Sequence, residues 1–218
     1  MTPQPRPDVP SAEGASVVFI IDDDASLRTS LGNLFESVGL QTEVFQSAKE
    51  FLHYNKPEVP SCLVLDIRLP GINGLDFQTE LLEAKIHIPI IFMTGHGDIP
   101  MTVRAMKAGA VDFLTKPIHD QQMLDAVSKA IERDRERRKS EKAMSNLRAL
   151  FESLGARERE VMTLVTAGLM NKQVAAKTGL AEITVKIHRG NVMKKMGAKS
   201  LADLVRMAET LGLHSGES

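Results

Sequence analysis

Three aspartates, a threonine and a lysine stand out because their side chains together could handle a phosphoryl group. Asp22, Asp23, Asp66, Thr94 and Lys116 all lie at the ends of short apolar segments. Crowded carboxylates repel one another, but a hard cation such as Mg2+ (or Mn2+) makes their proximity favourable. One aspartate then remains as a nucleophile that is already ionised at neutral pH. These residue types therefore predict phosphoryl transfer to a carboxylate.

The segments that precede these residues are predicted to be strands of one parallel sheet. Five such runs alternate with helical patterns, at residues 17–21, 42–45, 62–65, 89–93 and 111–114. The carboxyl ends of parallel strands meet at one edge of a sheet, so residues far apart in sequence can converge there. We expect a doubly wound α/β domain, whose strand order the pattern leaves open.

Helix boundary signals occupy the segments between the strands. A helical pattern at 26–38 ends at Gly39, and Ser47 and Glu50 have the spacing of a capping box. Asp24 is expected to cap the helix that follows it. Pro100 suits a first helical turn and Gly109 suits a helix end.

Length and charge indicate two domains with different partners. A chain of 218 residues exceeds the usual size of a single core. Residues 1–125 hold 9 Lys and Arg against 17 Asp and Glu, whereas residues 126–218 hold 18 against 11. The halves thus carry net charges of −8 and +7. An acidic half suits a cation site, and a basic half suits nucleic acid.

The remaining composition is that of a cytoplasmic protein. Cys62 is the only cysteine and lies in an apolar run, so we expect it to be buried and not bridged within the chain. Apolar stretches fall short of the ~20 residues of a membrane span. The Pro-rich residues 1–15 lack the apolar core of a signal peptide and are predicted to be a disordered tail.

A long helical connector is predicted between the two domains. The segment from Asp120 to Leu154 contains neither Gly nor Pro, and its charges at helical spacing support a solvated helix. The pattern is compatible with one helix or two. A later apolar stripe of Met144, Leu147, Phe151 and Leu154 is compatible with packing inside the second domain or with a dimer seam.

The C-terminal region is predicted to contain four helices. Their ranges are 156–167, 171–178, 182–196 and 200–211, separated at Gly168, Gly179 and Gly197. The second and third helices form a helix-turn-helix candidate, and the third is rich in cationic residues. This pattern favours binding to double-stranded DNA.

The first domain resembles the receiver domain of two-component response regulators. The resemblance runs from Val17 to about Arg133, and TGHGDIPMTVRAMKAGAVDFLTKP (94–117) is similar to the FixJ branch. It implies a flavodoxin-like fold with a five-stranded parallel sheet and Asp66 as phosphoacceptor. The implied ligands of Mg2+ (or Mn2+) are Asp22, Asp23, Asp66 and the backbone carbonyl of Arg68. Thr94 and Lys116 would bind the phosphoryl group, and Phe113 would be the aromatic switch residue.

The second domain resembles the LuxR/NarL-type DNA-binding domain. GARERE, NKQVA, TVKIHR and MKKMGAKS carry the resemblance, which makes 182–196 the recognition helix. Lys186 and Ile187 match positions that face the major groove, where they could read guanine acceptors and thymine methyl groups. Phosphate contacts are assigned to Thr184, Arg189, Lys194 and Asn171. Gly190 departs from the polar or basic side chain of many relatives, so a base contact is expected to be lost there.

Together these features predict a transcription regulator of the FixJ/NarL type that is controlled by phosphorylation. The expected parts are a tail (1–15), a receiver domain (16–133), a helical linker (134–152) and a LuxR-type domain (153–218). The expected partners are a sensor histidine kinase, promoter DNA, RNA polymerase and, after phosphorylation, a second copy of the chain. The phosphoacceptor would dephosphorylate itself but would not be an enzyme. Two alternatives remain open, an aspartyl-phosphate hydrolase that uses Asp66 and a ligand-sensing LuxR-type regulator.

Overall fold

The computed structural model describes residues 15–95 and 99–213. The chain divides into two units, with the boundary between Arg138 and Lys139. Nearly all of the predicted N-terminal tail lies outside the described residues. The first unit therefore comprises the α/β part, and the second begins within the connector.

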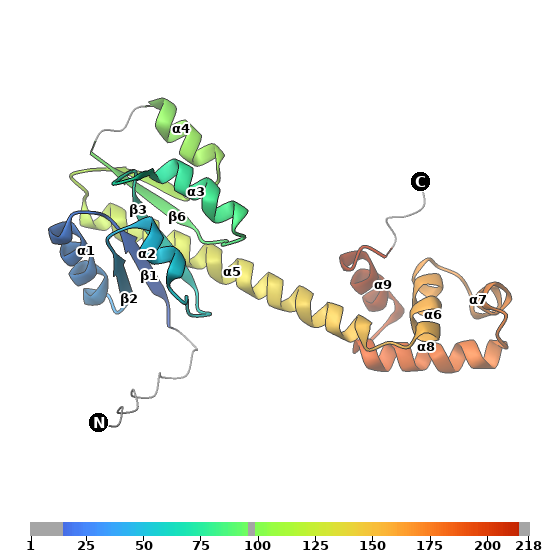
Figure 1. The fold of residues 1–218 in the computed structure, drawn as a ribbon. Helices are drawn as coiled ribbons and strands as arrows, with labels where there is room; N and C mark the ends of the chain where they lie inside the picture. Colours follow the sequence, from blue (N-terminus) through green and yellow to red (C-terminus); the bar gives the residue numbers. More distant parts are fainter. Residues whose placement is uncertain (1–14, 96–98, 214–218) are drawn as a thin grey trace, which may run out of the picture. The chain divides into compact units, whose positions relative to one another are not determined.

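The first unit is built on a five-stranded parallel sheet with the order β2-β1-β3-β6-β7 (Figure 1). The strands are β1 (Val17–Ile21), β2 (Gln41–Phe45), β3 (Ser61–Asp66), β6 (Ile90–Thr94) and β7 (Asp112–Thr115). This confirms the predicted flavodoxin-like sheet. The order reverses between the neighbouring strands β1 and β3, and this switch point is where open α/β sheets bind ligands.

Helices cover both faces of the sheet because its strands alternate their side chains between two cores. One core combines Phe19 and Leu63 of the strands with residues of α2 (Ala48–His53), α3 (Gly74–Glu83) and α4 (Ile99–Lys107). The other combines Val18 and Cys62 with residues of α1 (Ala25–Ser37) and α5 (Asp120–Glu152). Cys62 is buried and not bridged, as predicted, and burial raises the pKa of its thiol.

A short hairpin after β3 was not predicted. It pairs β4 (Arg68–Leu69) with β5 (Ile72–Asn73), and Gly71 takes a positive φ of 87° in its turn. The sequence indicated only a loop here, because each strand has two residues and carries no periodicity. The hairpin returns the chain to the end of β3, where α3 begins.

The connector is one continuous helix, α5, of 33 residues. Its first part buries Met123 and Val127 against the sheet. Of the later apolar stripe, Leu147, Phe151 and Leu154 belong to a core of the second unit. Packing inside that unit is therefore the arrangement observed for these three residues.

Asp134 ties α5 to the sheet close to the boundary between the units. Its carboxylate is fully buried and accepts a hydrogen bond of 3.0 Å from the backbone N–H of Ser61, at the start of β3. Arg137 and Arg138 each approach the same carboxylate to 2.6 Å. One side chain thus accepts a hydrogen bond from a strand end and forms ion pairs with two arginines of the helix.

The second unit contains the four predicted helices. They are α6 (Ala156–Thr166), α7 (Asn171–Thr178), α8 (Glu182–Met196) and α9 (Leu201–Thr210). α8 contributes to two small cores, one shared with α9 and one shared with α6 and α7. Over the described parts of the chain, no helix is both long and apolar enough to span a membrane.

Candidate functional site

The ends of β1 and β3 bring the predicted acidic residues together. Ile21 and Leu65 are paired across the two strands, so Asp22 and Asp66 emerge side by side. Asp22 is fully buried, Asp66 is 6% exposed and Asp23 is exposed. Oxygens of these three aspartates all lie within 4.8 Å of one another.

Lys116 places its ammonium between two of these carboxylates. Its Nζ lies 2.8 Å from Oδ2 of Asp22 and 2.5 Å from Oδ2 of Asp66. The backbone N–H of Lys116 donates a 2.7 Å bond to the carbonyl of Thr94, and the Lys116–Pro117 peptide is cis. Thr94 ends β6 and is buried. Four strand ends therefore meet at one place on the sheet.

Burial and ion pairing shift two pKa values in this cluster. Burial raises the pKa of Asp22, although the hydrogen bond from Lys116 works against the shift. For Lys116, burial lowers the pKa, but hydrogen bonds to Asp22 and Asp66 outweigh it and leave the pKa raised. Lys116 is therefore cationic at neutral pH. Three carboxylates and one ammonium leave a formal surplus of negative charge, and such oxygen donors fit a hard divalent cation.

Neighbouring backbone groups hold the acidic residues in place. Asp24 caps α1 through a 2.8 Å bond from the N–H of Ser26, as predicted, and its own N–H donates to Asp22 Oδ1 at 2.8 Å. On the other strand, the N–H of Arg68 donates to Asp66 Oδ1 at 2.9 Å. Backbone N–H groups thus orient the carboxylates of Asp22 and Asp66.

Gly74 allows α3 to begin directly against the Asp66 strand. A Cβ at this position would lie 2.8 Å from the carbonyl oxygen of Asp66 and 2.9 Å from Cα of Ile67. Such distances are far below ordinary van der Waals contact. Only glycine fits there without a shift of the backbone.

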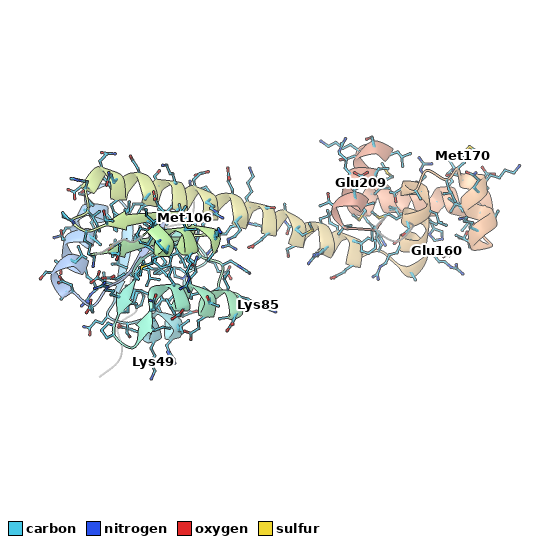
Figure 2. All side chains as sticks on the ribbon, turned by 90° about the horizontal axis from the view of Figure 1, so that it is seen from above. Lys49, Lys85, Met106, Glu160, Met170 and Glu209 are labelled. Carbon is cyan, nitrogen blue, oxygen red and sulfur yellow. The ribbon has the colours of Figure 1, made fainter. Side chains whose placement is uncertain are left out.

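Phe113 lies on β7, next to the site. Its ring is partly buried, and its centroid is 6.5 Å from that of Phe92 in the core. The neighbouring helix α4 exposes three apolar side chains, Ile99, Val103 and Met106 (Met106 is labelled in Figure 2). The strand that carries the predicted switch residue thus borders an apolar helix surface.

The predicted DNA contacts gather on α7 and α8. Lys186, Ile187 and Lys194 are exposed, whereas Thr184, Arg189 and Asn171 are partly buried. Nη1 of Arg189 lies 3.2 Å from Oδ1 of Asn171, so these two residues already touch across the helices. All six residues therefore lie on two adjacent helices.

Both units match known families. Residues 18–128 match "Response regulator receiver domain", and residues 152–208 match "Bacterial regulatory proteins, luxR family". The chain belongs to the response regulators. Its receiver fold and its LuxR-type helical domain, both predicted from the sequence, are confirmed. Together the two families imply a kinase and DNA as partners of this response regulator.

Similar proteins extend the match over almost the whole chain. Nodulation protein W of Bradyrhizobium diazoefficiens is 63% identical over 207 residues, which are 95% of this chain and 91% of that protein. Transcriptional regulatory protein FixJ of Azorhizobium caulinodans is 43% identical, over 90% of this chain and 93% of that one. A low-resolution structure of response regulator StyR matches with a TM-score of 0.82 and 48% identity, over 90% of this chain and 99% of that chain. This response regulator is therefore a DNA-binding transcription regulator of the FixJ/NarL type.

Three residues of these sites were missed by the sequence reasoning. Arg28 is buried and donates from Nη1 to the carbonyl of Asp22 at 2.5 Å, and Gly74 supports the Asp66 strand. Ile183 is exposed on α8 beside the predicted contacts. Its four-residue spacing to Ile187 was a readable signal, whereas the roles of Arg28 and Gly74 depend on distances between elements.

Proposed function

We propose that this response regulator accepts a phosphoryl group on Asp66 from a sensor histidine kinase and then binds promoter DNA as a dimer. The contacts of the Lys116 ammonium with Asp22 and Asp66 carry the proposal. They put a cation and a nearly buried carboxylate at the sheet edge, beside Thr94. A phosphoryl group on Asp66 would lie next to the Lys116 ammonium and the Thr94 hydroxyl.

In the transfer step, a carboxylate oxygen of Asp66 forms a bond to phosphorus. The bond from phosphorus to the kinase imidazole breaks, and the imidazole nitrogen keeps the electron pair. Lys116 pairs with the phosphoryl oxygens, and the Thr94 hydroxyl donates a hydrogen bond to one of them. In this proposal a carboxylate oxygen of Asp66 is itself the nucleophile, so no separate general base is assigned. Water later cleaves the acyl phosphate, which releases inorganic phosphate and restores the Asp66 carboxylate. In this proposal the hydrolysis resets a switch and does not turn over an external substrate, so the protein acts as a regulator and not as an enzyme.

A divalent cation completes the site in this proposal. Its ligands are Asp22, Asp23, Asp66 and the backbone carbonyl of Arg68, a set of hard oxygen donors that fits Mg2+ (or Mn2+). When bound, the cation would supply charge neutralisation for the transferred phosphoryl group. Asp23→Asn removes one carboxylate and is expected to raise the Mg2+ concentration needed for phosphorylation.

The phosphoacceptor is tested by labelling with a small phosphodonor. The full-length protein with Mg2+ should gain one acid-labile phosphoryl group, measured by intact mass spectrometry. Asp66→Asn should gain none, because an amide is not a nucleophile. Asp24→Asn is the matched control: asparagine also caps helices, so this variant should label normally. Stoichiometric labelling of the Asp66→Asn protein would contradict the assignment.

Phosphorylation is proposed to act through Thr94, Phe113 and α4. The phosphoryl group adds about −1.5 to −2 charges beside Thr94, and movement of Thr94 toward it makes room for Phe113 to turn inward. The partly buried ring of Phe113 and the exposed apolar side chains of α4 support this sequence of changes. The dimer would then form through α4, β7 and the start of α5.

In the second unit, α8 is proposed to read the major groove. Lys186 and Ile187 contact base edges, whereas Thr184, Arg189, Lys194 and Asn171 contact phosphates. Their position on the two helices of the helix-turn-helix supports this division. We place the protein in the cytoplasm, where it would act with RNA polymerase at promoters.

A further inference from the structure

α8 carries two apolar surfaces. One is buried and consists of Val185, Val192 and Met196. The other consists of Ile183 and Ile187, which are 65% and 57% exposed although both are large apolar side chains. The helix therefore presents two isoleucines to solvent. They are separate from the buried side chains that hold the domain together.

The two exposed isoleucines lie in one stripe along the helix. At 3.6 residues per turn, positions four and seven apart share a face, so Ile183, Ile187 and Gly190 are aligned. This stripe is opposite the buried residues of α8. A Cβ at Gly190 would meet no atom within 4 Å, so the stripe is open at that point. Lys194 continues the same stripe toward the end of the helix.

The positive charges beside the isoleucines indicate which kind of molecule binds this stripe. Lys186 and Lys194 are exposed on the same side of α8, and an apolar protein partner would have to bury both cations. A DNA duplex instead offers phosphates for the lysines. Its major groove also offers one apolar group on the base edges, the methyl group of thymine.

We propose that Ile183 is a specificity-determining residue that reads a thymine methyl group, as a partner of Ile187. The inference rests on the proposed placement of α8 in the major groove. Four residues of helix rise about 6 Å, and two base steps rise about 7 Å. The two isoleucines thus fit thymines about two steps apart in each half-site, and Gly190 reads no base.

The test uses full-length protein, treated with phosphodonor, and a duplex selected by this protein from random DNA. Each thymine of the selected site is replaced in turn by deoxyuridine, which lacks only the methyl group. Binding should weaken at two thymine positions per half-site, by about fourfold for each methyl group, as expected for one buried methyl. Ile183→Ala should abolish the effect at one position, and Ile187→Ala should abolish it at the other.

Two controls separate lost readout from a damaged fold. Alanine favours helix and position 183 is exposed, so Ile183→Ala should keep its helix content by circular dichroism. Met170→Ala removes another apolar side chain, which is 68% exposed at the start of α7 (Figure 2). This variant should show the same deoxyuridine effects as the wild type.

The outcomes distinguish this inference from the proposed function. If Ile183→Ala keeps both deoxyuridine effects while Lys186→Ala changes the preferred sequence, α8 is in the groove but Ile183 does not read thymine. If the selection enriches no sequence, both the placement of α8 and the role of Ile183 are overturned.

Discussion

The phosphoacceptor site depends on the absence of a Cβ at position 74. Gly74→Ala would place a Cβ 2.8 Å from the Asp66 carbonyl, so the backbone of β3 or α3 must move. We expect a loss of about 2 kcal/mol in unfolding free energy, typical of overpacking, and slower phosphorylation of Asp66. Urea unfolding followed by fluorescence of Tyr54, the only tyrosine, reports the receiver unit, where this residue packs on Phe19 and Phe45.

A second glycine gives a control with the opposite expected sign. Gly32 lies inside α1, and a Cβ there would meet only Oγ1 of Thr42, at an ordinary 3.8 Å. Gly32→Ala should therefore stabilise the receiver unit by up to about 1 kcal/mol, through helix propensity. Equal effects of both substitutions would contradict the close approach of α3 to the Asp66 strand.

At the residue scale, the convergence of the site could be predicted but its support could not. Asp22, Asp66, Thr94 and Lys116 follow from one rule, because the carboxyl ends of parallel strands share an edge. Arg28 of α1 and Gly74 of α3 support the site because these helices lie close to the strands. Local sequence patterns do not predict such distances, which become known only once the helices are packed on the sheet.

At the element scale, the Asp134 carboxylate should determine how firmly α5 is held to the sheet. Asp134→Ala removes the acceptor for the Ser61 N–H and the partner of Arg138. Loss of a buried charged partner predicts destabilisation of the receiver unit by about 3 kcal/mol, measured with the Tyr54 signal. Glu136→Ala, at an exposed position of the same helix, should have little effect. Similar losses for both variants would mean that helix charge, not the bond to β3, is responsible.

In the second unit, Glu158 should make the stability of α6 depend on pH. The hydrogen bond from Lys195 lowers the pKa of Glu158, and the N–H of Gly155 adds to the shift. The folded state thus has the lower pKa, so the stabilisation is present above the unfolded value of about 4.3 and is lost as pH falls through the folded pKa.

Glu158→Gln tests this linkage. Half-exposure of Lys195 limits the expected loss to about 1 kcal/mol at pH 7, and the difference from wild type should vanish as pH falls below about 4. Hydrogen exchange in α6 and α8, measured by mass spectrometry, follows this unit separately. A difference that stays constant with pH would show that packing of the side chain is lost, not its charge.

Element types could be predicted well, because periodicity and capping residues are local. The five strands lie within one residue of their predicted bounds. The pattern predicted a helical connector but left open whether it is one helix or two, and the structure has the single helix α5. The β4–β5 hairpin and the strand order could not be predicted. Two-residue strands have no periodicity, and the crossover rules allow each new strand on either side of the sheet.

For the whole molecule, we predict that phosphorylation changes the oligomeric state from monomer to dimer. Sedimentation with phosphodonor should detect a dimer, and Arg104→Glu on the exposed side of α4 should weaken it through charge reversal. Shifting a two-state equilibrium from 1:99 to 99:1 takes about 5.5 kcal/mol. A smaller free-energy change on phosphorylation would therefore convert only part of the protein to dimer.

Lys49→Glu is the matched control for that change. It reverses the same charge on α2, at an exposed position (Figure 2), and should leave the dimer intact. A phosphorylated monomer that still gains DNA affinity would contradict assembly as the switch. It would instead support release of an inhibitory contact between the units.

The shared position of Lys116 makes two binding events interdependent. One ammonium, that of Lys116, pairs with the carboxylates of both Asp22 and Asp66. If a divalent cation binds Asp22 and Asp66 is phosphorylated, as we propose, the Lys116 ammonium would pair with the phosphoryl group in place of Asp22. Thermodynamic linkage requires the effect to be reciprocal: whatever factor the cation adds to the stability of the phosphorylated form, phosphorylation adds to the affinity for the cation. In the proposed mechanism, cation binding and phosphorylation would therefore each strengthen the other, because both depend on the position of the Lys116 ammonium.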